Sequence, residues 1–179
     1  MILGLDVSTA ITGATVVDKG GKVVYTAAWD TRNKKHFPTL ISKAAWVEER
    51  LIDVGKKYKI EEVYVEQPIQ FLGSGKSTSK TISVLYGFNG MLSWICYQVL
   101  HCEPHYLAPA SARKSCGIIV PRGSKAKEVV LKYVLDNNPL FEVEYTRHGN
   151  PKPGTYDRAD SIIIAKAGYI EWTKRSLRS

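Results

Sequence analysis

The sequence lacks a membrane-spanning run, an internal repeat and a low-complexity segment. No stretch approaches the roughly 18 consecutive apolar residues of a transmembrane helix, so we expect no membrane partner. The N-terminus has no basic-then-apolar leader, so we expect no export signal and a cytoplasmic location.

Cysteine is scarce. The three cysteines, Cys96, Cys102 and Cys116, are odd in number and show no Cys-x-x-Cys spacing. This pattern argues against a disulfide framework and indicates a reducing compartment. His101, Cys102 and His105 could be considered zinc ligands, but they lack a fourth partner.

Acidic residues are few relative to basic ones. There are 17 Asp and Glu against 25 Lys and Arg, which gives a net charge of +8. Such a surplus favours polyanionic partners, and nucleic acid is the better candidate because no basic amphipathic helix is present to lie on lipid. The alternative is that the positive charge only keeps the protein soluble and reflects no polyanionic partner. The 179 residues, 44% of them apolar, are typical of one globular domain spanning 1–179.

The opening stretch, residues 2–13, combines an apolar run with one carboxylate, Asp6. The run predicts a buried strand, and burying a charge costs on the order of several kcal/mol unless it is paired or neutralised. Two further apolar runs flank Gly20-Gly21, a strong hairpin signal. We therefore predict an antiparallel meander whose first strand ends in an acid. The simpler explanation is that Asp6 begins a turn.

The rest of the chain alternates helical patterns with strands. Apolar residues at steps of three and four from Leu40 to Tyr58 predict an amphipathic helix that covers the sheet and is opened by Pro38. The strand 61–66 follows this crossover, so we expect it to lie parallel to the first and to end in Glu66. Further elements are expected at 78–100 (a long helix, apolar almost all round), 105–108 (a strand), 110–115 and 125–135 (helices) and from Tyr156 (the last helix).

These elements indicate the α/β class, with a mixed sheet that joins the meander to parallel strands. Between Pro139 and Thr155 the chain carries prolines, glycines and Arg147-His148. This composition predicts a long loop that is ordered but mobile.

Two phosphate-binding patterns are partial matches. The stretch 73–78 resembles a P-loop, but Gln70 stands where the first glycine belongs, and Glu66 places a negative charge beside it. No later strand ends in an aspartate that could hold magnesium. The opening 6–9, followed by a hairpin, resembles the first phosphate loop of actin-like sugar kinases, which need two such domains. We therefore expect no nucleotide cofactor.

Four carboxylates stand where carboxylates are costly: Asp6, Glu66, Asp157 and Asp160. The first two end strands that should lie side by side. The other two are three apart and share a face at the start of the last helix, where helix capping is an alternative explanation. Like charges repel unless cations lie among them, and magnesium prefers oxygen ligands. Two such ions can activate water and stabilise the leaving oxygen, which predicts a nuclease.

The order of these acids, an Asp on strand one, a Glu on strand four and Asp-x-x-Asp on the last helix, resembles the RuvC family of Holliday junction resolvases over essentially the whole chain. The resemblance implies an RNase H-like fold with a mixed five-stranded sheet and helices on both faces. It also implies a homodimer through the helix 78–100 and magnesium-dependent paired nicking of branched DNA, with manganese as a substitute. Asp6, Glu66, Asp157 and Asp160 would then be catalytic and would hold two ions per active site.

The resemblance also implies DNA contacts. The loop 71–80 would enter the junction, with Phe71 or Leu72 as a wedge. Bacterial members usually have Asp-Pro-Gly where this chain has Asp-Val-Ser at 6–8, a sequence that is closer to the phage, viral and organellar branches. Of these we expect a phage or viral member that acts in the host cytoplasm. The long loop before Asp157 is also unusual for the family. The other implied DNA contacts are Lys76, Lys80, Arg113, Lys114, Lys125 and Lys127.

Two other functions stay open at the level of sequence. A nuclease of the RNase H type that cuts RNA in RNA–DNA hybrids would carry its Glu on the first helix, where this chain offers Glu48 and Glu49. A non-catalytic protein that binds branched DNA would not need the acids, so their presence argues against it.

Overall fold

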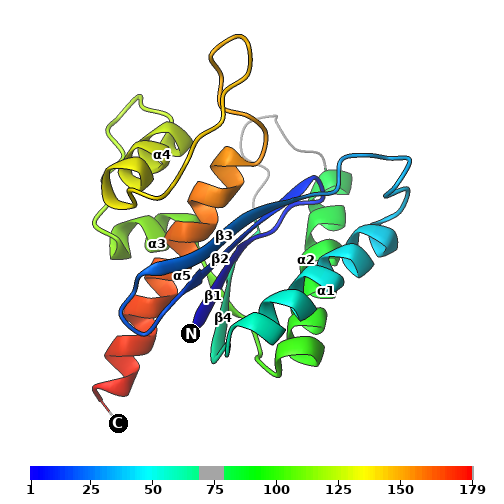
Figure 1. Cartoon of the computed structure of the whole chain (residues 1–179), viewed down its shortest axis with the longest axis horizontal. Coiled ribbons are helices and arrows are strands. Elements are labelled where there is room, and N and C mark those ends of the chain that lie inside the picture. Colours follow the sequence, from blue (N-terminus) through cyan, green and yellow to red (C-terminus); the bar gives the residue numbers. More distant parts are fainter. Residues whose placement is uncertain (69–78, 179) are drawn as a thin grey trace.

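The computed structural model describes residues 1–68 and 79–178. Within this part of the chain, five strands form one sheet in the order β3-β2-β1-β4-β5. The first three strands are antiparallel neighbours, while β4 and β5 run parallel to β1 (Figure 1). The expected mixed five-stranded sheet is confirmed. The bounds are Ile2–Asp6 for β1, Ile11–Val17 for β2, Val23–Asp30 for β3, Glu62–Glu66 for β4 and His105–Leu107 for β5.

The register of β1 puts two acids at neighbouring strand ends. Antiparallel pairing sets Asp6 opposite Gly13 on β2, and parallel pairing sets Leu5 opposite Val65 on β4. Because parallel strands point their carboxyl ends toward the same edge, Glu66 follows Val65 at the edge where Asp6 ends β1. The sheet therefore has the alignment that the crossover predicts.

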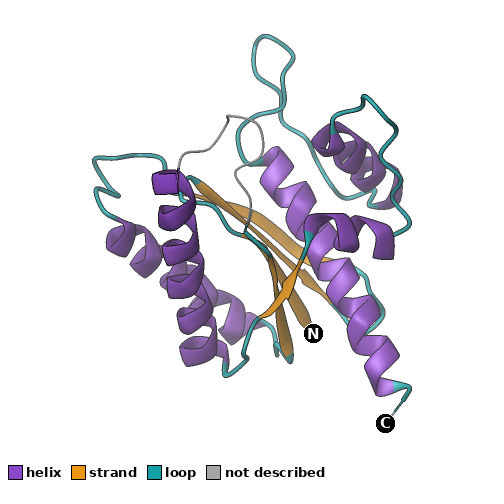
Figure 2. Cartoon of the chain, turned by 180° about the vertical axis from the view of Figure 1, so that it is seen from behind, coloured by secondary structure: helices purple, strands orange, loops and turns teal. Residues whose placement is uncertain are grey.

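Helices cover both faces of the sheet, as expected. Figures 1 and 2 show two helices against one face, and a second group built around the last helix on the other. None of the described helices is long and apolar enough to span a bilayer. The first group is α1 (Leu40–Lys57) and α2 (Ser79–Leu100), and the second is α3 (Pro109–Ser115), α4 (Ala126–Asn137) and α5 (Thr155–Ser176).

A capping box fixes the start of α1. Thr39 Oγ1 accepts a hydrogen bond from the Ser42 N–H at 3.1 Å, and Ser42 Oγ accepts one from the Thr39 N–H at 3.1 Å. These two bonds satisfy backbone donors that the helix itself leaves unpaired. The helix consequently begins at Leu40, and Pro38, which we expected to open it, precedes the cap.

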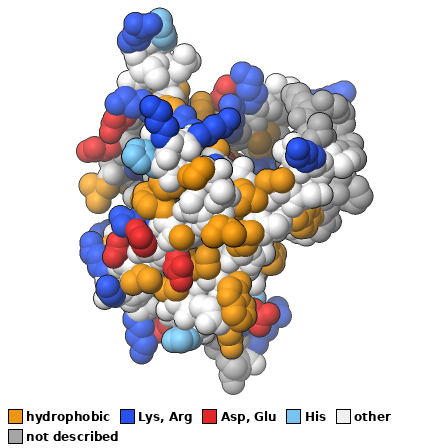
Figure 3. Space-filling model, turned by 90° about the vertical axis from the view of Figure 1, so that its right-hand side faces the viewer, with side chains coloured by type: hydrophobic (Ala, Val, Ile, Leu, Met, Phe, Trp, Pro, Cys, Tyr) orange, Lys and Arg blue, Asp and Glu red, His pale blue; other side chains and the backbone are white. Residues whose placement is uncertain are grey.

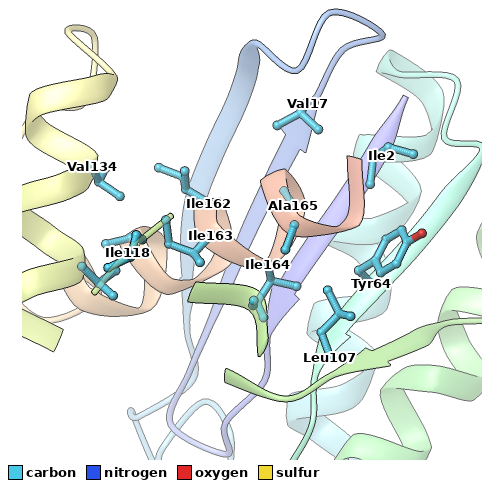
Figure 4. Packing of buried hydrophobic residues seen from close by; sticks show 14 of the residues in the cluster. Ile2, Val17, Tyr64, Leu107, Ile118, Val134, Ile162, Ile163, Ile164 and Ala165 are labelled. Atoms are coloured by element: carbon cyan, nitrogen blue, oxygen red, sulfur yellow. The ribbon is translucent and has the colours of Figure 1, made fainter. Parts of the chain in front are cut away.

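Each face of the sheet has its own core because side chains alternate along a strand. Leu3 and Val63 belong to the cluster that packs against α1 and α2, whereas Ile2 and Tyr64 belong to the cluster on the α5 side. Figure 4 shows the second cluster, in which these two side chains lie on the same side of the sheet as the buried isoleucines of α5: Ile162, Ile163 and Ile164.

Glycines allow α5 to lie directly against the sheet. A Cβ built on Gly4 of β1 would stand 2.6 Å from the Ala165 Cα. A Cβ on Gly13 of β2 would stand 2.5 Å from the carbonyl carbon of Asp157. Neither strand position can carry a larger residue without displacing α5, so the two glycines set how close the helix comes to the strands.

We expect Gly4→Ala to destabilise the protein by about 1–3 kcal/mol, because the added methyl group overlaps the backbone of α5. Urea unfolding followed by circular dichroism measures this loss. Gly20→Ala is the matched control, since its methyl group would meet only the Asp18 side chain, at 3.3 Å. The control should change the free energy of unfolding by no more than about 0.5 kcal/mol. Equal losses in both variants would contradict the close packing of α5.

Candidate active site

The structure brings the four acids to one edge of the sheet. Asp6 and Glu66 end β1 and β4, and α5 begins at the same edge with Asp157 and Asp160 in its first turns (Figure 1). Gly13 connects the two pairs, because it is the register partner of Asp6 and packs against the main chain of Asp157. Carboxylates that are far apart in the sequence therefore share one partly buried site.

Burial raises the pKa values of all four acids, and repulsion within the cluster raises those of Asp6, Glu66 and Asp160 further. The pKa of Asp6 lies well above its usual range, mainly through burial and then through the charges of Glu66, Asp160 and Asp157. Burial and the charge of Asp160 raise the pKa of Glu66 to about 7. Burial, followed by the charge of Asp157, raises the pKa of Asp160 to about 6. Burial also raises the pKa of Asp157.

Two arginines partly offset this negative charge. Arg113 of α3 acts against the larger effect of burial and lowers the pKa values of Glu66 and Asp160. Arg32 likewise lowers the pKa of Asp157 against the larger effect of burial. Asp30 holds Arg32 in place, with Nη2 donating to Oδ2 at 2.6 Å and Nε donating to Oδ1 at 2.9 Å. Cations from two different elements therefore act on the acidic cluster.

The four acids have the donor chemistry of a site for a hard divalent cation. Their ligating atoms are all carboxylate oxygens, which magnesium prefers. None of the four forms an ion pair with a Lys, Arg or His among the described residues, so a bound cation would relieve their repulsion. In the same part of the chain, no three His, Cys, Asp or Glu side chains already form a ligand group. Binding would therefore require these side chains to rotate, and their role as ligands stays a prediction.

The alternative zinc site at His101, Cys102 and His105 gains no support from the described residues, which form no such ligand group. Cys102 Sγ instead donates to the Leu100 carbonyl at 3.3 Å. His105 Nε2 lies 4.0 Å from Glu62 Oε2, at the opposite end of β4 from Glu66.

The turn that follows Asp6 is formed by its neighbours. Ser8 Oγ accepts hydrogen bonds from the N–H groups two and three residues later, at 3.2 and 3.0 Å. Lys43 Nζ of α1 donates to the Thr9 carbonyl and ties the turn to the helix. Burial and the charges of Glu66, Asp160 and Asp157 raise the pKa of Asp6. Among the described residues, the side chain that accepts the hydrogen bonds of this turn is that of Ser8.

The structure describes only some of the expected DNA contacts. Phe71, Leu72 and Lys76 lie outside the residues that the structure describes. Lys80, in the first turn of α2, and Lys114, near the end of α3, are both exposed. Their contact with DNA stays a prediction.

The two lysines expected at the start of α4 have partners within the protein. Lys125 Nζ lies 3.0 Å from Glu128 Oε1 in an exposed ion pair. Lys127 Nζ lies 4.8 Å from the centre of the Tyr156 ring, which directly precedes Asp157. Both lysines are exposed, so neither arrangement prevents a contact with phosphate.

Sequence reasoning missed three residues that shape the site: Gly13, Arg32 and Lys43. Gly13 carried a usable signal, because an isolated glycine in a strand indicates the close approach of another backbone. Arg32 and Lys43 carried none. Arg32 follows the end of β3 in a polar segment, and Lys43 lies on the amphipathic helix α1. The partners of both depend on how these elements pack against the rest of the protein, which the neighbouring sequence does not show.

No family model matches the sequence, and no curated protein matches it. Solved structures do resemble it. T. thermophilus RuvC in complex with a Holliday junction substrate gives a TM-score of 0.69 at 16% identity, covering 97% of this chain and 94% of that chain. Another Thermus thermophilus RuvC structure gives a TM-score of 0.64 at 16% identity, covering 97% of this chain and 96% of that chain. The yeast mitochondrial Holliday junction resolvase gives a TM-score of 0.62 at 16% identity, covering 99% of this chain and 80% of that chain.

The chain has the RNase H-like fold. The fold class expected from the sequence is thereby confirmed. At 16% identity the likeness establishes the fold alone.

We expect Glu66 to make the metal-free protein less stable as the pH rises. A carboxyl whose pKa is higher in the folded state keeps its proton longer when folded, so the unfolded state loses its proton first. The pKa of Glu66 rises from 4.5 to about 7 on folding. Its contribution to the free energy of unfolding should therefore fall between about pH 4 and about pH 7. Urea unfolding in EDTA, compared with Glu66→Gln, isolates this contribution.

Glu66→Gln should match or fall below the wild type at pH 4 and exceed it at pH 8 without divalent cations, because the variant has no charge to bury. Glu103→Gln is the control, since Glu103 is exposed and lies at the other end of the sheet, just before β5. This control should follow the wild type at every pH. If the free energy of unfolding at pH 8 stayed higher for the wild type than for Glu66→Gln, the raised pKa of Glu66 would be contradicted.

Proposed function

We propose that this protein is a structure-selective endonuclease that resolves four-way and other branched DNA junctions by paired, metal-dependent hydrolysis. The observation that carries the proposal is the meeting of Asp6, Glu66, Asp157 and Asp160 at one edge of an RNase H-like sheet. The structural neighbours, which include RuvC in complex with a Holliday junction substrate, support the same substrate class. The net charge of +8 supports a polyanionic substrate.

The four acids would hold two Mg²⁺ ions, with Mn²⁺ as a substitute, because all the donors are carboxylate oxygens. When bound, such ions supply activation of the attacking water and stabilisation of the leaving oxygen. The chain itself positions the substrate. Arg113, whose charge already acts on Glu66 and Asp160, is placed to bind the phosphate that is cut.

The remaining DNA contacts would lie around this centre. Phe71 or Leu72, outside the described residues, would enter the junction as a wedge between base pairs. The side chains proposed to bind flanking phosphates are Lys76, Lys80, Lys114, Lys125 and Lys127.

The Asp-Val-Ser sequence at 6–8 supports a place in the phage and viral branch of the family. The cysteines of the described residues are free thiols: Cys96, Cys102 and Cys116. Free thiols support action in a reducing cytoplasm, as in a phage-infected host.

Hydrolysis of RNA–DNA hybrids is the alternative that the sequence left open. It would need Glu48 or Glu49 of α1 in the acidic cluster. The charges that raise the pKa of Asp6 are those of Glu66, Asp160 and Asp157, and neither glutamate of α1 is among them. This favours the junction-resolving set of acids.

Cleavage of a labelled four-way junction tests the proposal. With Mg²⁺ the wild type should produce symmetric, ligatable nicks in opposite strands. Asp6→Asn should still bind the junction and lose at least about a hundredfold in rate, since even residues behind metal ligands contribute about 10- to 100-fold. Asp136→Asn, which changes an exposed acid of α4, is the control and should cut normally.

Two outcomes would count against the proposal. If no divalent cation supported cutting, the proposed nuclease activity would be contradicted. Faster cutting of an RNA–DNA hybrid than of the junction would favour the alternative instead.

Paired nicking needs two active sites, and α2 supports a homodimer that supplies them. Trp94 is 63% exposed and Tyr97 is 50% exposed, although both are large and apolar. Figure 3 shows the side of the molecule that carries α1 and α2, with hydrophobic side chains gathered on it. Exposed apolar surface of this kind marks protein interfaces. The other exposed apolar residues of α2 are Val84, Tyr86 and Met91.

We expect the wild type to sediment as a dimer of 20.0 kDa chains. Trp94→Glu should weaken dimerisation at least about tenfold, because it places a charge at the centre of an apolar interface. Leu140→Glu is the control, since Leu140 is 85% exposed on the loop that follows α4. A monomeric wild type, or equal weakening by both variants, would contradict an interface on α2.

A further inference from the structure

Residues 144–152, which precede α5, form a hairpin-like loop that we call the finger. Lys152 N–H donates to the Glu144 carbonyl at 2.8 Å, and Thr146 N–H donates to the Asn150 carbonyl at 2.8 Å. Gly149 closes the turn with a φ of 75° and an N–H bond to the Thr146 carbonyl at 2.9 Å. The long loop that the sequence predicts thus folds back on itself, with its two sides joined by these hydrogen bonds and by one isolated bridge between Tyr145 and Pro151.

The base of the finger is fixed against the rest of the protein. The Arg158 guanidinium lies 4.5 Å from the centre of the Phe141 ring, and its Nη1 donates to the Glu142 carbonyl at 3.3 Å. Gly154, with a φ of 90°, packs so closely that a Cβ there would stand 2.6 Å from the Ala28 Cβ of β3. The finger is therefore held between β3 and α5, directly before the acids of that helix.

The tip of the finger carries a cation without an acidic partner. Lys152 Nζ is already paired with Glu144 Oε2 at 2.6 Å. Arg147 is exposed, forms no ion pair among the described residues and donates from Nε to His148 Nε2 at 3.0 Å. Its terminal guanidinium nitrogens are left for another acceptor. Figure 3 shows basic and histidine side chains at the end of the projection at the top of the molecule.

The finger rises from the edge of the sheet where the acids meet. Figure 1 shows it extending beyond the start of α5, on the side to which β1 and β4 point. The finger therefore projects on the side of the molecule from which DNA would reach the acids. An exposed arginine at the tip of the finger matches the geometry of backbone phosphate oxygens.

We propose that the finger is a DNA clamp: it lies along the duplex arm next to the phosphate that is cut, with Arg147 bound to a backbone phosphate. The clamp rests on the proposed function of the acidic site. It would hold the arm in position and carry no sequence information, as phosphate contacts do. Because the finger leads directly into α5, the same contact would orient the arm relative to Asp157 and Asp160.

The test measures how salt affects binding to a four-way junction in an Asp6→Asn background, which holds the substrate uncut. One phosphate contact contributes about 0.9 to the slope of log affinity against log salt. Arg147→Ala should lower that slope by about 0.9 and weaken binding roughly five- to tenfold at 0.1 M salt. Arg147→Lys should restore most of both, because a lysine keeps the charge. The changes should be the same for junctions of different sequence.

Arg178→Ala is the matched control. It removes the same charge just beyond the far end of α5, about 30 Å from the finger along a helix of 22 residues. This variant should leave both the slope and the affinity close to those of the parent.

Three results would overturn the clamp: an unchanged slope in Arg147→Ala, an equal loss in Arg178→Ala, or a loss confined to one junction sequence, which would indicate base reading. In each of these cases the proposed nuclease function stands if the wild type still cuts junctions. If the parent does not bind junctions and the wild type does not cut them, the nuclease proposal fails and the clamp fails with it.

Discussion

The close contact between α5 and the sheet is the constraint on which the site depends. Gly4 and Gly13 leave no room for a side chain between the strands and the helix, so backbone lies against backbone. Since Gly13 pairs with Asp6 and touches the main chain of Asp157, this contact fixes the distance between the two halves of the acidic cluster. A hydrogen bond of 2.8 Å between the buried Thr15 and Ser161 hydroxyls holds the next turn of the helix in register.

The acids held together in this way oppose the stability of the fold. Burial raises the pKa values of all four, repulsion within the cluster adds to this for Asp6, Glu66 and Asp160, and the arginines at 32 and 113 offset only part of the effect. Proteins keep such strained clusters where chemistry uses them. Divalent cations would remove the repulsion, and the surrounding basic surface would guide a polyanion toward the same edge. In the proposed function, the acidic centre and the basic residues around it would act on the same DNA substrate.

Much of this arrangement follows from local sequence pattern. Asp6 and Glu66 could be placed together because each ends an apolar run and a helical crossover makes the two strands parallel. The three-residue spacing of the last two acids puts them on one helix face. Arg32, Lys43 and the finger could not be predicted, because their positions depend on contacts between elements distant in the chain. Polar loops and exposed helix faces carry no periodic signal for such contacts.

In the proposed function, the four carboxylates that α5 and the sheet bring together bind divalent cations. A crystal of the wild-type protein soaked in manganese, with anomalous diffraction measured at the manganese edge, tests it most directly. The account predicts manganese between the carboxylates of Asp6 and Glu66 and those of Asp157 and Asp160, with the carboxyl groups turned toward the ions. A fully soaked crystal with no manganese at this edge, or with manganese bound only elsewhere on the surface, would contradict it.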